Sequence, residues 1–170
     1  MRHENGRGCD ATRRKLILGA LALPLAALLA RRASAGETAG LAARVEAITA
    51  PLVGRLGFSA QRLDGGTVIA LNADERFPMA SLFKIPIVLA ALRRVHTGPG
   101  RIKGLLPRGT PVAHKTGTIG GVANDAGFVT LPDGGRMALA VFTKSSSTPV
   151  ADRDRAIAET ARALYDHFAT

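Results

Sequence analysis

The sequence predicts an α+β fold, a sheet of five mostly antiparallel strands flanked by an N-terminal and a C-terminal helix. Three observations carry this prediction. Apolar residues recur at helical spacing near both ends of the chain that follows residue 35. Between them lie short β-type runs joined by Gly-rich turns. Residues 81–96 are apolar in every direction around a helix axis, which is typical of a helix buried on all sides.

Residues 1–35 have the pattern of an export signal peptide. Arg13-Arg14-Lys15 precedes an apolar run over 16–30, and Ala33-Ser34-Ala35 forms a small-residue cleavage site. The paired arginines favour the twin-arginine export route over the general one. The apolar run is too short to span a bilayer comfortably, although a single-span anchor is the alternative. We therefore expect an exported protein, periplasmic or secreted, with no stable membrane anchor after cleavage.

Composition excludes several classes of function. The chain carries 23 Lys and Arg against 13 Asp and Glu, a net charge of +10, but the signal peptide holds much of that excess. With one Tyr, no Trp and scattered basic residues, we expect no nucleic-acid partner. The single cysteine, Cys9, leaves with the signal peptide, so no disulfide is expected. His96, His114 and His167 show no ligand spacing, and we expect neither a metal nor a cofactor.

The expected mature chain covers residues 36–170. Its first half begins with a predicted helix. From Glu37 onwards, apolar side chains recur at helical spacing, and Gly54 and Gly57 offer a stop. The apolar positions are Leu41, Val45, Ile48 and Leu52. Two short strands follow, over 57–63 and 67–72, joined by Asp64-Gly65-Gly66 as a β-hairpin. A polar loop then leads to Ser81.

In the second half of the mature chain, the sequence predicts three strands and a final helix. Residues 101–110 show no period and are interpreted as a connection. Strands are expected over 111–118, 122–131 and 137–143, the last two joined by Pro132-Asp133-Gly134-Gly135. Thr148 is the expected N-cap and Pro149 the first residue of the last helix. Its expected core side chains are Val150, Ile157, Leu164 and Phe168.

Ser81 and Lys84 form the first candidate catalytic pair. A spacing of i and i+3 on a helix places both side chains on one face, within reach of each other. A serine hydroxyl becomes a nucleophile when a base accepts its proton, and a lysine serves if its ammonium is destabilised. Here the apolar run and the nearby helix N-terminus would both destabilise the charged ammonium of Lys84. The alternative is a helix cap beside a solvated lysine.

Lys115, Thr116 and Gly117 form the second candidate motif, on an expected edge strand that continues to Thr118. A lysine and a hydroxyl can bind a carboxylate, and a glycine lets a substrate lie against the backbone. The alternative is an ordinary strand start with a solvated lysine.

Together the two motifs resemble those of the serine β-lactamases and penicillin-binding proteins. The stretches over 71–92, 112–121 and 124–144 resemble class A β-lactamases. The resemblance implies an enzyme, a hydrolase that opens β-lactams through an acyl-serine intermediate. It implies Ser81 as the nucleophile and Lys84 as its proton acceptor or orienting partner. Lys115 and Thr116 would hold the substrate carboxylate, and the amides of Ser81 and Thr118 would form the oxyanion hole.

Two elements of that family are absent from the sequence. Between Lys84 and Lys115 there is no Asp, Glu, Ser or Asn, so neither the family's Ser-Asp-Asn triplet nor its deacylating glutamate has a counterpart. We therefore expect that the family's all-helical domain is largely missing, with an internal deletion near residues 97–101. By counting, Asn124 stands where many members carry an arginine for the substrate carboxylate.

Three hypotheses for activity follow. The chain is a hydrolase that still turns over, a penicillin-binding remnant that is acylated without release, or an inactive deletion product. Loss of the helical domain would also expose the apolar helix over 81–96, and we expect self-association through it.

Overall fold

In a computed structural model of the chain, residues 39–84 and 99–170 are described. The chain divides into two compact units, residues 1–40 and 41–170, and nearly all described residues belong to the second. The expected signal peptide over 1–35 and the apolar segment over 85–96 lie outside the described residues. Both stay predictions, and so does the self-association expected through the apolar segment. Within the described ranges, no helix is long and apolar enough to cross a membrane.

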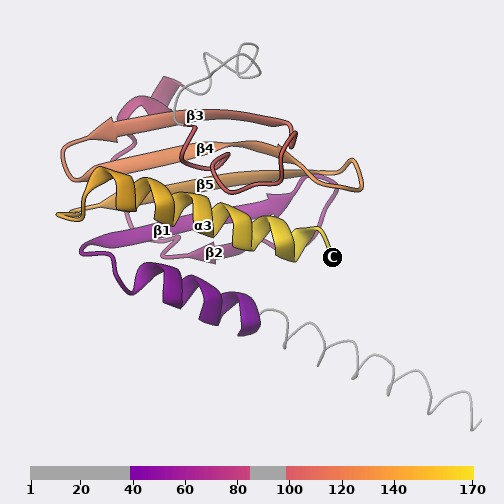
Figure 1. The fold of residues 1–170 in the computed structure, drawn as a ribbon, viewed down its shortest axis with the longest axis horizontal. Coiled ribbons are helices and arrows are strands. Elements are labelled where there is room, and N and C mark those ends of the chain that lie inside the picture. Colours follow the sequence, from indigo (N-terminus) through magenta and orange to yellow (C-terminus); the bar gives the residue numbers. More distant parts are fainter. Residues whose placement is uncertain (1–38, 85–98) are drawn as a thin grey trace, which may run out of the picture. The chain divides into compact units, whose positions relative to one another are not determined.

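Five antiparallel strands form one sheet in the order β2-β1-β5-β4-β3 (Figure 1). This confirms the predicted α+β fold with its five-stranded sheet. Alternating side chains and Gly-rich turns set the strand limits, because each turn ends a run with period two. The strands are β1 (Arg55–Arg62), β2 (Ile69–Leu71), β3 (Val112–Ile119), β4 (Val122–Thr130) and β5 (Arg136–Lys144).

Two of the described helices supply much of the rest of the core. One covers residues 39–49, and α3 (Val150–Phe168) contacts β4 and β5 (Figure 1). Arg44 of the first helix forms an ion pair with Asp166 of α3 at 3.0 Å. Alternation along the central strands turns every second side chain towards α3, and these positions are buried. The core includes Leu41, Val45, Phe58, Met137, Leu139, Val141, Ile157 and Leu164.

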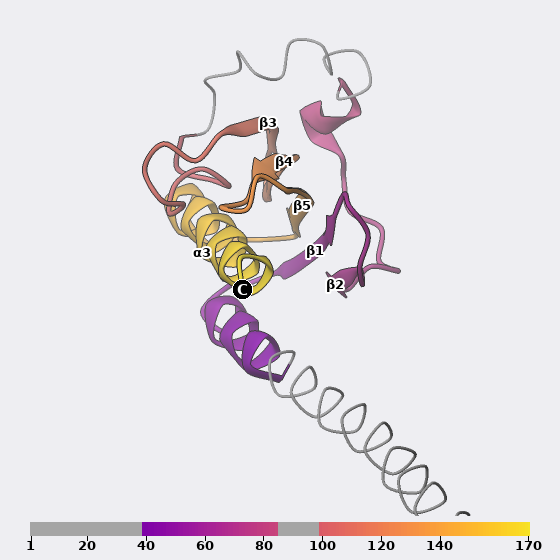
Figure 2. The ribbon, with the colours of Figure 1, turned by 90° about the vertical axis from the view of Figure 1, so that its right-hand side faces the viewer.

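The sheet has two chemically different faces, which the strand register defines. On the face covered by α3, Thr116, Asp125 and Val141 stand side by side across three strands. On the opposite face, Gly117, Asn124 and Phe142 do the same. We call these the α3 face and the η1 face, because the short 3₁₀ helix η1 (Ala80–Lys84) contacts β3 and β4 on the second. Figure 2 shows α3 and η1 on opposite sides of the strands.

The loop after β2 carries the chain across the sheet. β2 is one edge of the sheet, whereas η1 contacts β3 at the other edge. Residues 72–79 therefore run over the η1 face between the two edges. The predicted polar loop in this region has no regular secondary structure, as expected.

Three sequence predictions at element ends are wrong. Gly57 does not stop the first helix, because it lies inside β1. Thr148 is not the N-cap of α3: its hydroxyl oxygen accepts a hydrogen bond from the N–H of Val53 at 2.9 Å, and Pro149 takes the cap position. Val150 does not reach the core, because its side chain points to solvent from the first turn and is 47% exposed.

The stretch over 101–110 is more than a connection. Ile102 is fully buried and belongs to the core, and Arg101 is 5% exposed. The N–H of Ile102 donates to a carboxylate oxygen of Asp125 at 3.1 Å. Two isolated buried residues produce no periodicity, so a search for helical or strand patterns cannot find them.

Candidate active site

Ser81 and Lys84 lie on the same 3₁₀ helix, η1. With three residues per turn, side chains at i and i+3 are eclipsed, so these two stand directly above one another. Ser81 is half-buried and Lys84 is exposed. The helix expected to begin here as an α-helix is therefore 3₁₀ over its described residues. The side chain of Leu82 points into the protein, while the apolar run expected to shelter Lys84 continues over 85–96, outside the described residues.

The backbone just before Ser81 is strained. Ala80 has φ +47°, in the left-handed region that residues with a Cβ rarely adopt. Such a conformation costs about 1–3 kcal/mol and persists only where the surroundings enforce it. Leu82 supplies part of that enforcement, since its side chain is fully buried and its N–H donates to Met79 O at 3.0 Å.

Asn124 supplies another part from β4. Its side chain is fully buried, and its amide nitrogen donates to Pro78 O at 2.7 Å and, more weakly, to Met79 O at 3.4 Å. Its amide oxygen accepts the N–H of Thr143 at 3.1 Å. Asn124 thus binds the segment that leads to Ser81. Sequence reasoning missed this role, although an asparagine in the middle of an apolar strand was a visible signal.

β3 lies against η1 at Gly117. A Cβ built on Gly117 would come within 3.1 Å of Ala80 Cβ, Met79 O and the amide nitrogen of Ser81. Only a glycine permits this approach without displacement of the η1 backbone. The two predicted motifs, distant in sequence, therefore meet at Ser81 and Gly117.

Alternation along β3 divides the second motif between the two faces. Lys115 shares the η1 face with Gly117, whereas Thr116 and Thr118 belong to the α3 face. The ammonium of Lys115 donates to the backbone oxygen of Thr116 at 2.6 Å. The hydroxyl of Thr118 accepts a hydrogen bond from Arg101 at 2.7 Å. Of the predicted site residues, Ser81, Lys115 and Gly117 share the η1 face, while Thr118 offers that region its backbone.

A buried polar pair lies behind β3, on the α3 face. His114 Nδ1 is 2.8 Å from a carboxylate oxygen of Asp125, and both side chains are buried. Burial raises the pKa of the Asp125 carboxyl, and the hydrogen bond with His114 opposes that shift. In the part of the chain that the structure describes, no group of three or more His, Cys, Asp or Glu side chains is placed to hold a metal ion.

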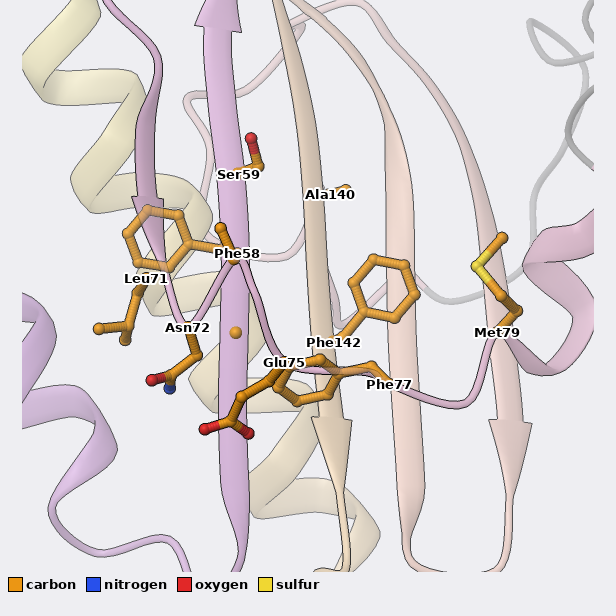
Figure 3. Close-up of a pocket in the computed structure, with 11 residues that line it drawn as sticks. Phe58, Ser59, Leu71, Asn72, Glu75, Phe77, Met79, Ala140 and Phe142 are labelled. Atoms are coloured by element: carbon orange, nitrogen blue, oxygen red, sulfur yellow. The ribbon is translucent and has the colours of Figure 1, made fainter.

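A hollow of about 370 Å³ lies on the η1 face beside the loop over 72–79 (Figure 3). The ring of Phe77 covers Gly57 of β1 and lies 6.1 Å from the ring of Phe142, centroid to centroid. The ammonium of Lys144 sits 4.6 Å from the Phe77 ring centroid. These contacts hold the loop against the sheet. The lining of the hollow is mostly apolar and includes Leu71, Phe77, Met79, Ala140 and Phe142.

Comparison with known proteins decides the family. A family model described as the beta-lactamase enzyme family matches residues 40–103 and 96–168. The chain belongs to this family. This confirms the resemblance that the motifs predicted. The β-lactamase family model covers both candidate motifs and all five strands.

Two curated β-lactamases are similar over part of their length. The chain is 47% identical over 75 residues to the extended-spectrum beta-lactamase PER-1 of Pseudomonas aeruginosa, covering 41% of this chain and 24% of that protein. It is 37% identical over 83 residues to beta-lactamase VEB-1 of the same species, covering 45% of this chain and 28% of that protein. The chain thus matches about a quarter of the length of these β-lactamases.

Solved structures agree at the level of the fold. A crystal structure of the TLA-1 extended-spectrum beta-lactamase aligns with a TM-score of 0.71 at 16% identity, covering 78% of this chain and 99% of that one. A beta-lactamase from Chitinophaga pinensis aligns with a TM-score of 0.67 at 19% identity, covering 75% and 98%. The sheet and its flanking helices are therefore those of the β-lactamase fold.

Proposed function

We propose that this chain is a serine β-lactamase-type hydrolase that retains the acylation half of the reaction, with Ser81 as the nucleophile. The observation that supports it best is the approach of Gly117 to the Ser81 amide, at 3.1 Å from a Cβ position. That approach brings the amide of Ser81 near the Gly117–Thr118 peptide, whose N–H is the second expected oxyanion donor.

The proposed acylation assigns a role to each group. The oxygen of Ser81 attacks the lactam carbonyl carbon, and Lys84 is the acceptor of the hydroxyl proton or the partner that orients the hydroxyl. The amides of Ser81 and Thr118 hold the negative oxygen that develops, a contribution worth about 3–4 kcal/mol per donor in other enzymes. The lactam C–N bond then breaks, its nitrogen takes up a proton, and the acyl group stays on Ser81 as an ester. Lys115 attracts the negatively charged substrate.

Release of the acyl group is the slow step in this proposal. Hydrolysis of the ester needs a water and a general base that accepts its proton. Because no carboxylate occurs between Lys84 and Lys115, the base that the family resemblance implies has no counterpart there. The second candidate, favoured by the same observation, is a penicillin-binding protein without turnover.

Labelling of the purified chain with a fluorescent penicillin, followed by intact-mass measurement, tests the proposal. We expect one covalent adduct in the wild type and none in Ser81→Ala. Ser59→Ala is the matched control, because Ser59 is an exposed serine of β1 on the same face of the sheet. An unlabelled wild type, or a labelled Ser81→Ala variant, would contradict the proposal.

The lifetime of the adduct separates the two candidates. After free penicillin is removed, a mass that returns to that of the free chain indicates turnover, and a chromogenic cephalosporin should then be hydrolysed. A mass that persists for hours indicates the binder without turnover.

A further inference from the structure

Arg101 is the most highly bonded side chain beside the candidate site. It is only 5% exposed and donates four hydrogen bonds. From the α3 face it reaches the backbone oxygens of Gly117 at 3.0 Å and Asn124 at 2.8 Å, and the hydroxyl of Thr118 at 2.7 Å. Its Nε donates to Asp154 of α3 at 2.8 Å. A planar guanidinium can hold several acceptors in one fixed geometry.

The position of these bonds matters more than their number. The C=O of Gly117 and the N–H of Thr118 belong to one peptide group, which is planar and trans, so they point in opposite directions. A side chain that fixes the Gly117 oxygen therefore also fixes the direction of the Thr118 N–H. Arg101 also donates to the hydroxyl of Thr118. With both ends held, the Gly117–Thr118 peptide plane cannot rotate freely.

β3 is an edge strand. Among the described strands it pairs with β4 alone, so no strand restrains its outer side. Asp154 lies in the N-terminal part of α3, so the guanidinium connects the edge strand to a helix packed on the core. The next residue, Ile102, strengthens this anchor through its fully buried side chain.

We propose that Arg101 is a positioning residue, which orients the Gly117–Thr118 peptide so that the Thr118 N–H serves as the second oxyanion donor beside the Ser81 N–H. The proposal rests on the proposed function. Arg101 acts from behind the strand, through the peptide. It therefore contributes equally to any acyl transfer to Ser81, whatever charge the acyl donor carries.

Acylation kinetics with two probes test this role. One probe is a penicillin, which carries a carboxylate, and the other is the neutral ester p-nitrophenyl acetate. In Arg101→Gln we expect the limiting rate of acylation to fall about tenfold to a hundredfold for both probes, somewhat less than the loss on removing an oxyanion donor. The half-saturating concentrations should stay within about twofold, because ground-state binding is not affected. Arg101→Lys should restore part of the rate.

Arg108→Gln is the matched control, since Arg108 is an exposed arginine of the same stretch. It should leave both rates unchanged. A loss restricted to penicillin, and expressed in the half-saturating concentration, would overturn the proposal and assign Arg101 to binding of the substrate carboxylate.

Backbone relaxation measured by ¹⁵N NMR gives a readout that needs no activity. In Arg101→Gln the order parameter of the Thr118 amide should fall from the rigid range, about 0.85, towards values below about 0.6, while amides of β5 stay rigid. An unchanged Thr118 amide in a folded variant would overturn the proposal. If neither probe labels the wild type, the proposed function fails. The order parameter of the Thr118 amide then still shows whether Arg101 holds the Gly117–Thr118 peptide.

Discussion

Gly117 is the residue on which the candidate site depends most directly. It allows the backbone of β3 to lie against the turn that carries Ser81, with the nearest atoms 3.1 Å from its Cβ position. Those atoms include backbone atoms of η1, which cannot rotate away as a flexible side chain can. The spacing between the nucleophile and the strand is therefore set by the absence of a side chain.

Gly117→Ala should separate β3 from η1 by a few tenths of an ångström. We expect penicillin labelling of Ser81 to slow by at least about tenfold, because a small misplacement of reacting groups costs much rate. Labelling rates measured by gel fluorescence would show this.

Gly120→Ala is the comparison for that change. A Cβ on Gly120 meets nothing within 4 Å, and its φ is outside the left-handed region. Its labelling rate should equal that of the wild type. Equal rates for both variants would show that the contact at Gly117 does not control acylation.

The loop over 72–79 is the element that delivers η1 to β3. Glu75 anchors it by ion pairs to Arg55 of β1 and, at 3.0 Å, to Lys144 of β5. The hydrogen bond from Arg55, followed by that from Lys144, lowers the pKa of Glu75 from 4.5 to about 2. Asn72 adds a bond from its amide nitrogen to Leu56 O at 2.6 Å.

The stability of this loop should therefore depend on pH. A carboxyl whose folded pKa lies below its unfolded value stabilises the fold above the unfolded pKa, and loses that contribution as pH falls through the folded one. Glu75 thus stabilises the protein above about pH 4.5 and ceases to do so as pH approaches about 2. Thermal melts should show a smaller decline over this window in Glu75→Gln than in the wild type. Identical pH profiles would contradict this account.

At the scale of the whole molecule, one core under the α3 face holds the sheet and helices together. Ile157 and Leu164 of α3 are fully buried against Met137 and Val141 of β5. The opposite face carries the candidate site and the shallow hollow. Stability and chemistry are therefore assigned to different sides of the sheet.

Ile157→Ala should destabilise the protein by about 2–5 kcal/mol, the usual cost of such a truncation in a packed core. Val150→Ala, on the exposed first turn of the same helix, should change stability by less than about 0.5 kcal/mol. Urea unfolding followed by circular dichroism measures both. A large effect at Val150 would support the core position that its spacing had suggested.

The fold was largely predictable, because strand alternation and helical spacing are local signals that survive in a single sequence. The strands, their pairing in two hairpins and the last helix follow from them. For the candidate site, the sequence offered only short motifs, at Ser81 and Lys115, and the catalytic roles of these residues stay predictions. Asn124 and Arg101 act through hydrogen bonds to backbone atoms far away in sequence, and such partners depend on register and crossing loops that no local pattern encodes.

The hydrogen bond from Asn124 to Pro78 has a consequence for chain length. It joins residues 46 apart and so closes a loop whose cost is mainly the lost freedom of the intervening chain. That cost grows only with the logarithm of length, and doubling the loop adds about 0.6 kcal/mol. The bonded groups at its ends can therefore stay in place while the number of residues between them changes greatly. A contact of this kind lets one half of a site keep its geometry through insertions and deletions in the segment that separates its parts.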